Sequence, residues 1–234
     1  HGNINLSQAI ERSCDVFFYE LGLKVGIEKI GLMLKKLGLS SNIDLELNEL
    51  RRGLVPSKKW KLDVKGTPWT PGETINASIG QGYMLSNPIE LVTMISRIAN
   101  SKWSIEPTLL SNKIQKFAKL DINKNHLNYI KNAMSEVVNS EFGTAYKSRL
   151  RNTNVKMAGK TGTVQVIRIS EEEREKGIIK NKDREWKKRD HALFVGYAPS
   201  VQPKYSICVI VEHGGSGSST AAPIAKDIIE KLLI

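Results

Sequence analysis

Hydrophobic residues recur at helical spacing in the first part of the chain and gather into short continuous runs in the last part. The helical spacing predicts a first helix over residues 6–25, capped by Asn5 and broken near Ser13-Cys14-Asp15. Three more helices are predicted over residues 27–37, 87–98 and 127–138. Residues 40–82 are rich in turn-forming residues and tryptophan, and we expect irregular loops there over a functional site.

The continuous runs predict strands over residues 155–169, 191–198 and 205–212. Residues 199–203 begin and end with proline, which favours a hairpin between the last two strands. Residues 170–190 are nearly all charged and are expected to form a solvated excursion, and a final amphipathic helix is predicted from about residue 218 to 233. This order predicts one domain over residues 1–234 with an α+β fold, an antiparallel sheet flanked by helices.

The composition is that of a globular domain with a strongly basic charge. Hydrophobic residues make up 40% of the chain, the net charge is +11 and the isoelectric point is near 9.6. The basic residues are dispersed, and their densest cluster, residues 180–189, is interrupted by Asp183 and Glu185. The sequence contains no nucleic-acid-binding motif, so nucleic acid is not an expected partner. A basic surface suits anionic phospholipid or a wall polymer.

The segment from Ala158 to Val166 carries the strongest chemical signal in the chain, Ala-Gly-Lys-Thr-Gly-Thr-Val-Gln-Val. Lys160 supplies a positive charge, Thr161 and Thr163 supply hydroxyl donors, and Gly162 leaves room for the close approach of a substrate. At the start of a strand, these groups predict a docking site for a carboxylate. An exposed lysine beside a turn would also explain the Lys-Thr-Gly triplet alone, so the neighbouring motifs decide.

A phosphate-binding P-loop is the competing interpretation, because Gly159-Lys160-Thr161 matches the end of that motif. The motif requires a glycine five residues before Gly159, where this chain has Asn154. It also requires a helix after the threonine, whereas the residues after Thr161 favour a strand. The P-loop interpretation therefore fails.

Ser13 is a second candidate, because it falls on the apolar stripe of the first predicted helix. An unsatisfied buried donor costs about 1–3 kcal/mol, so its hydroxyl needs a partner. A bond to a backbone carbonyl one turn earlier would explain Ser13 without any catalytic role. Ser40-Ser41-Asn42 resembles the same kind of motif, but it follows Gly38 and is typical of a turn.

These elements together resemble the serine acyl-transferases that share S-x-x-K, S-D-N and K-T-G motifs, and in particular the elongation-type (type 2) monofunctional penicillin-binding proteins. Ser13-Cys14-Asp15 departs from the commoner Ser-x-Asn of the wider family, which leaves the role of Asp15 less defined than that of Ser13. The motifs that carry the resemblance occur in the expected order at residues 13–15, 69–74, 78–83, 158–163 and 213–219.

The resemblance implies the penicillin-recognising serine transpeptidase/β-lactamase-like fold, incomplete at its N-terminus. No Ser-x-x-Lys occurs in the 234 residues, although in the family this motif carries the nucleophile and precedes Ser-x-Asp. The sequence opens at His1 and holds no apolar run of about 18 residues. We therefore expect the chain to be the C-terminal part of a longer protein, whose anchor, pedestal domain and nucleophile precede it, and to be inactive alone.

The activity implied by the resemblance is D-alanyl-D-alanine transpeptidation of peptidoglycan stem peptides, with covalent binding of β-lactams. Ser13 would relay a proton toward the leaving nitrogen, Lys160 would maintain the electrostatic field, and Asp15 would complete the catalytic set. Thr161, Gly162 and Thr163 would bind the terminal carboxylate. By resemblance, the whole protein works with a membrane glycosyltransferase at the periplasmic face of the bacterial inner membrane and needs no organic cofactor.

Two cysteines, Cys14 and Cys208, do not make a disulfide framework. Cys208 lies in a continuous apolar run typical of a strand buried on both faces, where it would act as a small core residue. By resemblance, His1 and Cys14 match half of a zinc site whose acidic ligands lie upstream. A terminal histidine and a buried thiol without metal are the alternative.

Three other functions remain open from the sequence. A serine β-lactamase shares the motifs but usually carries a deacylating carboxylate on a loop, which residues 69–83 do not resemble. A D-alanyl carboxypeptidase differs only in using water as the acceptor. A chain without a nucleophile could also be an inert or purely binding module.

Overall fold

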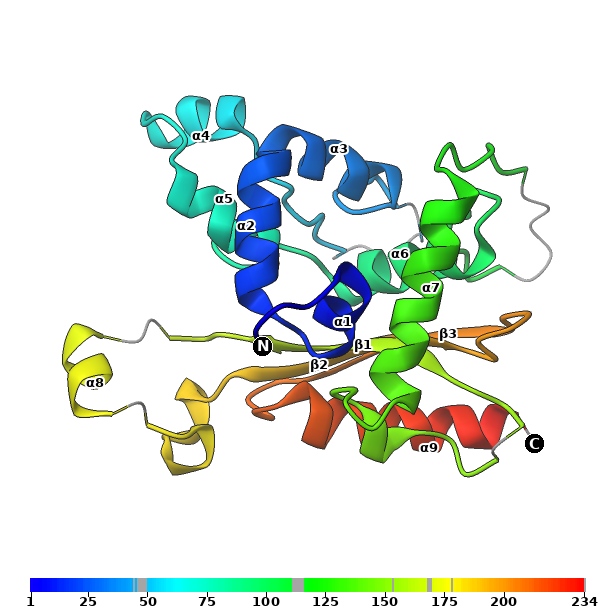
Figure 1. Ribbon diagram of the computed structural model, residues 1–234. Coiled ribbons are helices and arrows are strands. Elements are labelled where there is room, and N and C mark those ends of the chain that lie inside the picture. Colours follow the sequence, from blue (N-terminus) through cyan, green and yellow to red (C-terminus); the bar gives the residue numbers. More distant parts are fainter. Residues whose placement is uncertain are drawn as a thin grey trace. The chain divides into compact units, whose positions relative to one another are not determined.

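The computed structural model in Figure 1 describes residues 1–43, 45, 50–110, 116–152, 154–167, 170–177 and 179–233. The chain divides into two compact units, His1–Ala133 and Met134–Ile234, and the boundary between them falls inside helix α7. None of the described helices is both long and apolar enough to span a membrane.

The first unit is built from helices. The four helices predicted in this part of the sequence are present, and the break near Ser13 is confirmed. Asn5 and Asn87 both form capping boxes, with Gln8 and Glu90 respectively, as their spacing indicates. The helices that the structure describes here are α1 (Leu6–Glu11), α2 (Asp15–Val25), α3 (Ile27–Lys36), α4 (Lys58–Lys65), α5 (Pro71–Ser78), α6 (Pro88–Asn100) and α7 (Lys124–Asn139).

The expectation that residues 40–82 form only irregular loops is wrong, because α4 and α5 lie within this segment. Ser57 caps α4 through the N–H of Trp60, and Glu73 accepts a 2.7 Å hydrogen bond from the N–H of Thr70 at the start of α5. Both helices have only eight residues, too few to be stable alone in water, so tertiary contacts hold them.

An ion pair links α4 to α5. Lys61 is buried and its Nζ lies 2.5 Å from Oε1 of Glu73, while the same Nζ donates to the carbonyl of Pro68 at 2.7 Å. Burial alone would raise the pKa of Glu73, but hydrogen bonds from Lys61 and Thr70 outweigh it and lower the pKa. The lowered pKa keeps the Glu73 carboxylate ionised beside Lys61.

Helix α5 packs closely against α2. A Cβ added at Gly22 of α2 would lie 2.5 Å from Cβ of Ser78, so only glycine allows this approach. The contact fixes α2, whose first residue follows the Ser13 turn directly.

The second unit contains a three-stranded antiparallel sheet in the order β1 (Ala158–Val164), β2 (His191–Ala198), β3 (Tyr205–Val211). The hairpin predicted between the last two strands is confirmed. After β3 the chain forms the single π-turn η4 (Gly217–Ala221) and then helix α9 (Ala222–Leu232), which lies against β2 and β3 (Figure 1). The core of this unit is fully buried and includes Phe194, Tyr197, Ala225 and Ile229.

Two strand predictions need correction. Strand β1 is shorter than predicted and ends at Val164, while residues 168–169 of the predicted strand lie outside the described residues. Strand β3 is not buried on both faces: most of its residues are half-buried, because among the described strands it pairs only with β2. Burial still raises the pKa of the Cys208 thiol to about 11, and both cysteines are free thiols.

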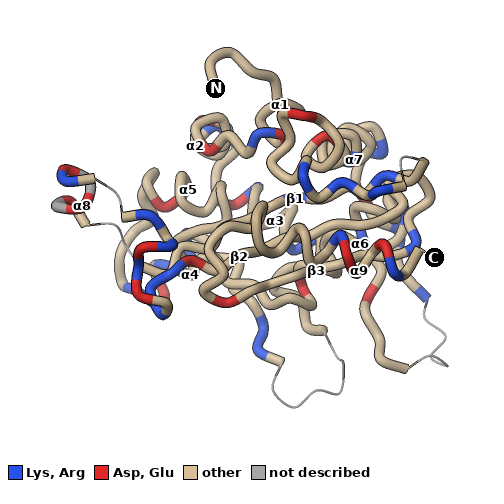
Figure 2. Tube along the Cα trace, turned by 90° about the horizontal axis from the view of Figure 1, so that it is seen from below, with Lys and Arg blue, Asp and Glu red and all other residues tan. Residues whose placement is uncertain are grey.

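The described residues of the charged segment between β1 and β2 are mostly exposed, as a solvated excursion requires, but the segment also contains short helical elements. It contains α8 (Glu171–Lys176) and two short turns, η2 (Asn181–Asp183) and η3 (Trp186–Lys188). Arg184 pairs with Glu173, and the Arg189 side chain donates to the carbonyls of Arg184 and Lys182. Figure 2 shows lysines and arginines interspersed with acidic residues along this segment, as its sequence indicates.

Candidate active site

Four consecutive predicted site residues lie on β1, at the edge of the described sheet. Lys160 pairs with Val195, Thr161 with Phe194, Gly162 with Leu193 and Thr163 with Ala192. Since side chains alternate along a strand, Thr161 and Thr163 share one face and Lys160 lies on the other. The Lys160 ammonium donates to the carbonyl of Thr161 at 3.0 Å, and Thr163 is exposed. Both hydroxyls therefore face the same way, as a carboxylate site requires.

Thr144 is a residue of this site that the sequence did not reveal. Its Oγ1 lies 2.8 Å from Oγ1 of Thr161, within hydrogen-bonding distance. Gly143 makes this approach possible, because a Cβ there would lie 2.3 Å from the carbonyl oxygen of Val137. No periodicity or motif spacing in the sequence points to Thr144, because its place in the site depends on a contact with a residue 17 positions further along the chain.

The His213–Ser219 motif supports the same strand through Gly217. A Cβ added at Gly217 would lie 2.3 Å from the carbonyl oxygens of both Gly162 and Leu193. The backbone of η4 therefore lies directly against the backbone of β1 and β2, and no other residue type fits at Gly217. This motif, which the sequence analysis used only for its resemblance, has a structural role at the Gly162 position.

Ser13 lies in the turn between α1 and α2 and is half-buried. Ser13 therefore lies in the predicted break and not on the apolar stripe of the helix, because α1 ends at Glu11. Ser13 has a φ of +53°, and its N–H donates to the carbonyl of Ile10 at 3.3 Å. A non-glycine residue in this left-handed conformation costs about 1–3 kcal/mol and is often found at functional sites.

Asp15 is the exposed first residue of α2, where its carboxylate complements the partial positive charge of the helix N-terminus. This position gives Asp15 a structural role independent of catalysis. Cys14 is the buried N-cap residue of the same helix, and His1 is exposed. Among the described residues, no three His, Cys, Asp or Glu side chains are grouped to hold a metal ion, so the zinc prediction is unsupported.

The predicted site residues thus form two groups. Lys160, Thr161, Gly162 and Thr163 are consecutive on one strand of the second unit, whereas Ser13 and Asp15 belong to one turn of the first unit. Each group has the local geometry described above within its own unit.

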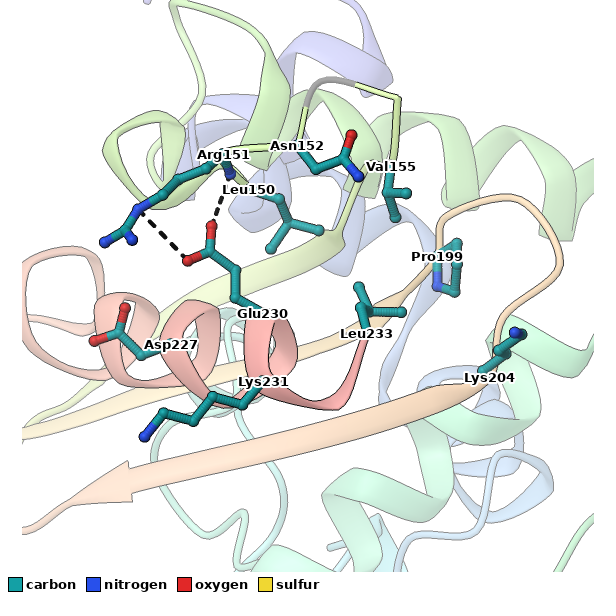
Figure 3. Close-up of a pocket in the computed structure, with 10 residues that line it drawn as sticks. All are labelled: Leu150, Arg151, Asn152, Val155, Pro199, Lys204, Asp227, Glu230, Lys231 and Leu233. Carbon is teal, nitrogen blue, oxygen red and sulfur yellow. Dashed lines mark hydrogen bonds and ion pairs between the residues drawn. The ribbon is translucent and has the colours of Figure 1, made fainter.

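A cavity elsewhere in the second unit includes none of these residues. Its volume is about 720 Å³, and Figure 3 shows Leu150, Val155, Pro199 and Leu233 around it. The side chain of Arg151 lies 3.6 Å from the Glu230 carboxylate, which also accepts the backbone N–H of Arg151 at 2.7 Å.

A helical unit with a serine turn at the start of α2, and an antiparallel sheet with Lys-Thr-Gly-Thr on its edge strand, define the class of penicillin-recognising serine acyl-transferases. The family model "Penicillin binding protein transpeptidase domain" matches residues 1–230, and the chain belongs to this family. The predicted α+β fold is confirmed by this match and by similar solved structures.

Curated relatives include "Peptidoglycan D,D-transpeptidase MrdA" of Salmonella typhimurium strain SL1344, 33% identical over 99% of this chain and 38% of the relative. The Haemophilus influenzae protein of the same name is 31% identical over 100% of this chain and 37% of its own length. The chain therefore spans well under half the length of these relatives.

Two solved structures are similar over nearly the whole chain. The penicillin-binding protein PBP2 of Helicobacter pylori, in complex with MreC, has a TM-score of 0.87, 34% identity, and coverage of 100% of this chain and 41% of its own. PBP2 of Pseudomonas aeruginosa, in complex with WCK 5153, has a TM-score of 0.80, 32% identity, and coverage of 99% and 48%.

Proposed function

We propose that the protein containing this chain is a peptidoglycan D,D-transpeptidase of cell-wall elongation. The observation that carries the proposal is the Lys160–Thr163 segment, which presents two hydroxyls on one face of an edge strand beside a lysine. The relatives named peptidoglycan D,D-transpeptidase and the PBP2 structures support the same activity. The transpeptidase chemistry of the family needs no organic cofactor.

Thr161 and Thr163 bind the terminal carboxylate of a stem peptide ending in D-Ala-D-Ala, and Gly162 leaves space for the substrate backbone. Lys160, whose side chain leaves the opposite face of the strand, maintains a positive electrostatic field at the site. The backbone N–H of Thr163 is one donor to the oxyanion, and losing such a donor typically costs about 10²–10³ in rate. Ser13 relays a proton to the leaving nitrogen, and Asp15 completes the catalytic set.

The covalent step uses a serine that lies outside these 234 residues, because no Ser-x-x-Lys occurs among them. The serine oxygen bonds to the penultimate D-alanyl carbonyl carbon, the peptide C–N bond breaks, and D-alanine leaves with the proton. An amine of a neighbouring stem peptide then takes the acyl group, loses a proton and restores the serine. A β-lactam carries a similar carboxylate and acylates the same serine.

The same relatives support a proposal for the partners and the location of the whole protein. Solved relatives are described as a complex with MreC and as part of "a peptidoglycan synthase complex" that coordinates polymerization and crosslinking. We expect the whole protein to act with a membrane glycosyltransferase at the periplasmic face of the inner membrane. Zinc bound by His1 and Cys14 would need further ligands from outside this chain.

The test is acylation of the full-length protein by a fluorescent penicillin, followed by gel fluorescence. Lys160→Ala should abolish labelling, whereas Lys156→Ala, which removes an exposed lysine just before β1, should label normally. Near-normal labelling of Lys160→Ala would contradict the proposal. Analysis of products from stem-peptide substrates separates the alternatives: cross-linked dimers indicate transpeptidation, and released D-alanine without dimers indicates a carboxypeptidase.

The 234-residue chain alone should form no covalent adduct with the same penicillin, because it contains no nucleophile activated by an adjacent base. Labelling of this short chain would mean that the nucleophile lies within it.

A further inference from the structure

His191 and His213 make a specific contact that the transpeptidase chemistry does not use. The backbone N–H of His213 donates to Nδ1 of His191 at 2.8 Å, and the two rings lie 4.7 Å apart. Nδ1 of His213 in turn contacts the carbonyl oxygen of Arg189 at 3.0 Å, and its ring lies 4.5 Å from Trp186. His213 has a φ of +56°, a conformation that a non-glycine residue keeps only where its surroundings hold it.

Asp190, next to His191 in the sequence, connects this histidine contact to the residues that follow β1. Its Oδ1 accepts the N–H of Val166 at 3.2 Å, and its backbone carbonyl accepts the N–H of Gly215 at 2.8 Å. The Asn181 side chain makes two hydrogen bonds to Asp190: its Nδ2 donates to Oδ2 of Asp190 at 2.8 Å, and its Oδ1 accepts the backbone N–H of Asp190 at 3.0 Å. Three segments that are distant in sequence therefore meet at Asp190 and His191: β1, the segment before β2, and the loop after β3.

The loop after β3 then reaches the carboxylate-binding strand. Gly217 follows His213 by four residues and lies against the backbone of Gly162, as shown by the 2.3 Å separation that an added Cβ would have. His191 itself pairs with Val164, next to the Thr163–Ala192 pair. A shift of the loop is thus transmitted to Gly162, which lies between the two threonines.

We infer that His191 is a positioning residue: by accepting the His213 N–H, it fixes the loop that sets the place of Gly162 and the two flanking hydroxyls. This inference rests on the proposed function for its substrate. A misplaced pair of hydroxyls weakens the binding of a carboxylate ligand, because charge-assisted hydrogen bonds depend on geometry. The effect should appear in ligand affinity more than in the chemical step.

The experiment compares two amide substitutions in the full-length protein. The amide oxygen of His191→Asn is attached at the same distance from the backbone as Nδ1 and can accept the His213 N–H. The amide oxygen of His191→Gln lies one bond further out and cannot occupy that position. Stopped-flow acylation by a penicillin separates the dissociation constant of the initial complex from the acylation rate constant.

We expect His191→Gln to raise the dissociation constant about tenfold, equivalent to about 1.4 kcal/mol, with the acylation rate constant nearly unchanged. His191→Asn should stay within about twofold of the wild type. Equal constants for the two variants, or a change in melting temperature alone, would overturn the inference.

A readout independent of activity keeps the two proposals separate. Hydrogen exchange at the amides of Gly162, Thr163 and Gly215 should be faster in His191→Gln than in the wild type and in His191→Asn. If the wild type is not acylated by penicillin but this exchange pattern is found, the proposed function fails and the positioning role stands. Unchanged exchange in both variants of an acylated protein contradicts the positioning role alone.

Discussion

The hydroxyl oxygens of Thr144 and Thr161 lie 2.8 Å apart, which places a loop residue in contact with strand β1, where we propose that the substrate carboxylate binds. The hydrogen bond limits the rotation of the Thr161 hydroxyl, so the group is held in one orientation before a ligand arrives. Preorganised donors bind a charged ligand with less loss of conformational freedom.

Removing this hydroxyl should therefore weaken ligand binding. Thr144→Val should lower the second-order rate of penicillin acylation of the full-length protein by about three- to tenfold, in line with the loss of about 1 kcal/mol for one hydrogen bond. Thr144→Ser retains the hydroxyl and should acylate at a rate close to that of the wild type. Equal rates for the valine and serine variants would show that Thr144 does not orient Thr161.

Because α2 and α5 are in close contact, we expect alanine substitutions at two glycines, Gly22 and Gly72, to differ in their effect on the free energy of unfolding. Gly22→Ala should destabilise the protein by about 1–3 kcal/mol, because the new methyl group would lie 2.5 Å from Cβ of Ser78. Gly72→Ala is the matched control in α5, since a Cβ there meets nothing within 4 Å and alanine favours a helix. Urea unfolding measures both variants, and equal stabilities would contradict the close approach.

Because of the Lys61–Glu73 ion pair, we expect the free energy of unfolding to depend on pH in the acidic range. The pKa of Glu73 is lowered in the folded state, whereas an unfolded glutamate titrates near 4.3. As the pH falls, the unfolded chain binds the proton first, so this stabilisation is complete above about pH 4.3 and is lost below it.

Glu73→Gln should lower the free energy of unfolding at pH 7 by about 1–3 kcal/mol, since it leaves the buried Lys61 ammonium without its charged partner. The variant should also lose less stability than the wild type between pH 5 and about pH 3. Unfolding curves at several pH values measure both effects, and parallel curves for the two proteins would contradict the assignment.

At Tyr197 we expect a substitution to phenylalanine to stabilise the protein. It is fully buried, and its hydroxyl has no hydrogen-bond partner among the described residues. Tyr197→Phe should therefore raise the free energy of unfolding by about 1 kcal/mol, because an unsatisfied buried hydroxyl is removed while the ring is kept. Tyr129→Phe is the contrasting control and should lower it, because the Tyr129 hydroxyl accepts the N–H of Ser7 at 3.1 Å.

Tyr197 should also make the free energy of unfolding depend on pH in alkaline solution. Burial raises the pKa of Tyr197, so above about pH 10 the unfolded phenol ionises while the folded one stays neutral. Stability should fall as the pH rises through this range, and Tyr197→Phe should remove that part of the fall. Unfolding measured between pH 9 and about pH 11 checks the slope, which would be the same in both proteins if the hydroxyl were hydrated in the folded state.

The sequence by itself determined the features that depend on neighbours along the chain. The capping boxes at Asn5 and Asn87, the hairpin between β2 and β3, and the Lys160–Thr163 strand were all predicted, since caps, turns and β-branched runs are local signals. The Thr70–Glu73 pair carried the same local signal for α5, and the prediction of loops there missed it. The family motifs were likewise local, and the transpeptidase family match confirms the family that they indicated.

Only the tertiary structure decided the contacts that join distant residues. The hydrogen bond from Thr144 to Thr161, the approach of Gly217 to Gly162 and the bond from His213 to His191 leave no periodic trace in the sequence. The sequence located the break near Ser13 but placed the Ser13 side chain on the apolar stripe of the helix, because the apolar spacing continues through the turn while the helix ends at Glu11. Periodicity reports which face of an element is apolar, whereas packing against distant residues fixes where that element ends and which side chains meet.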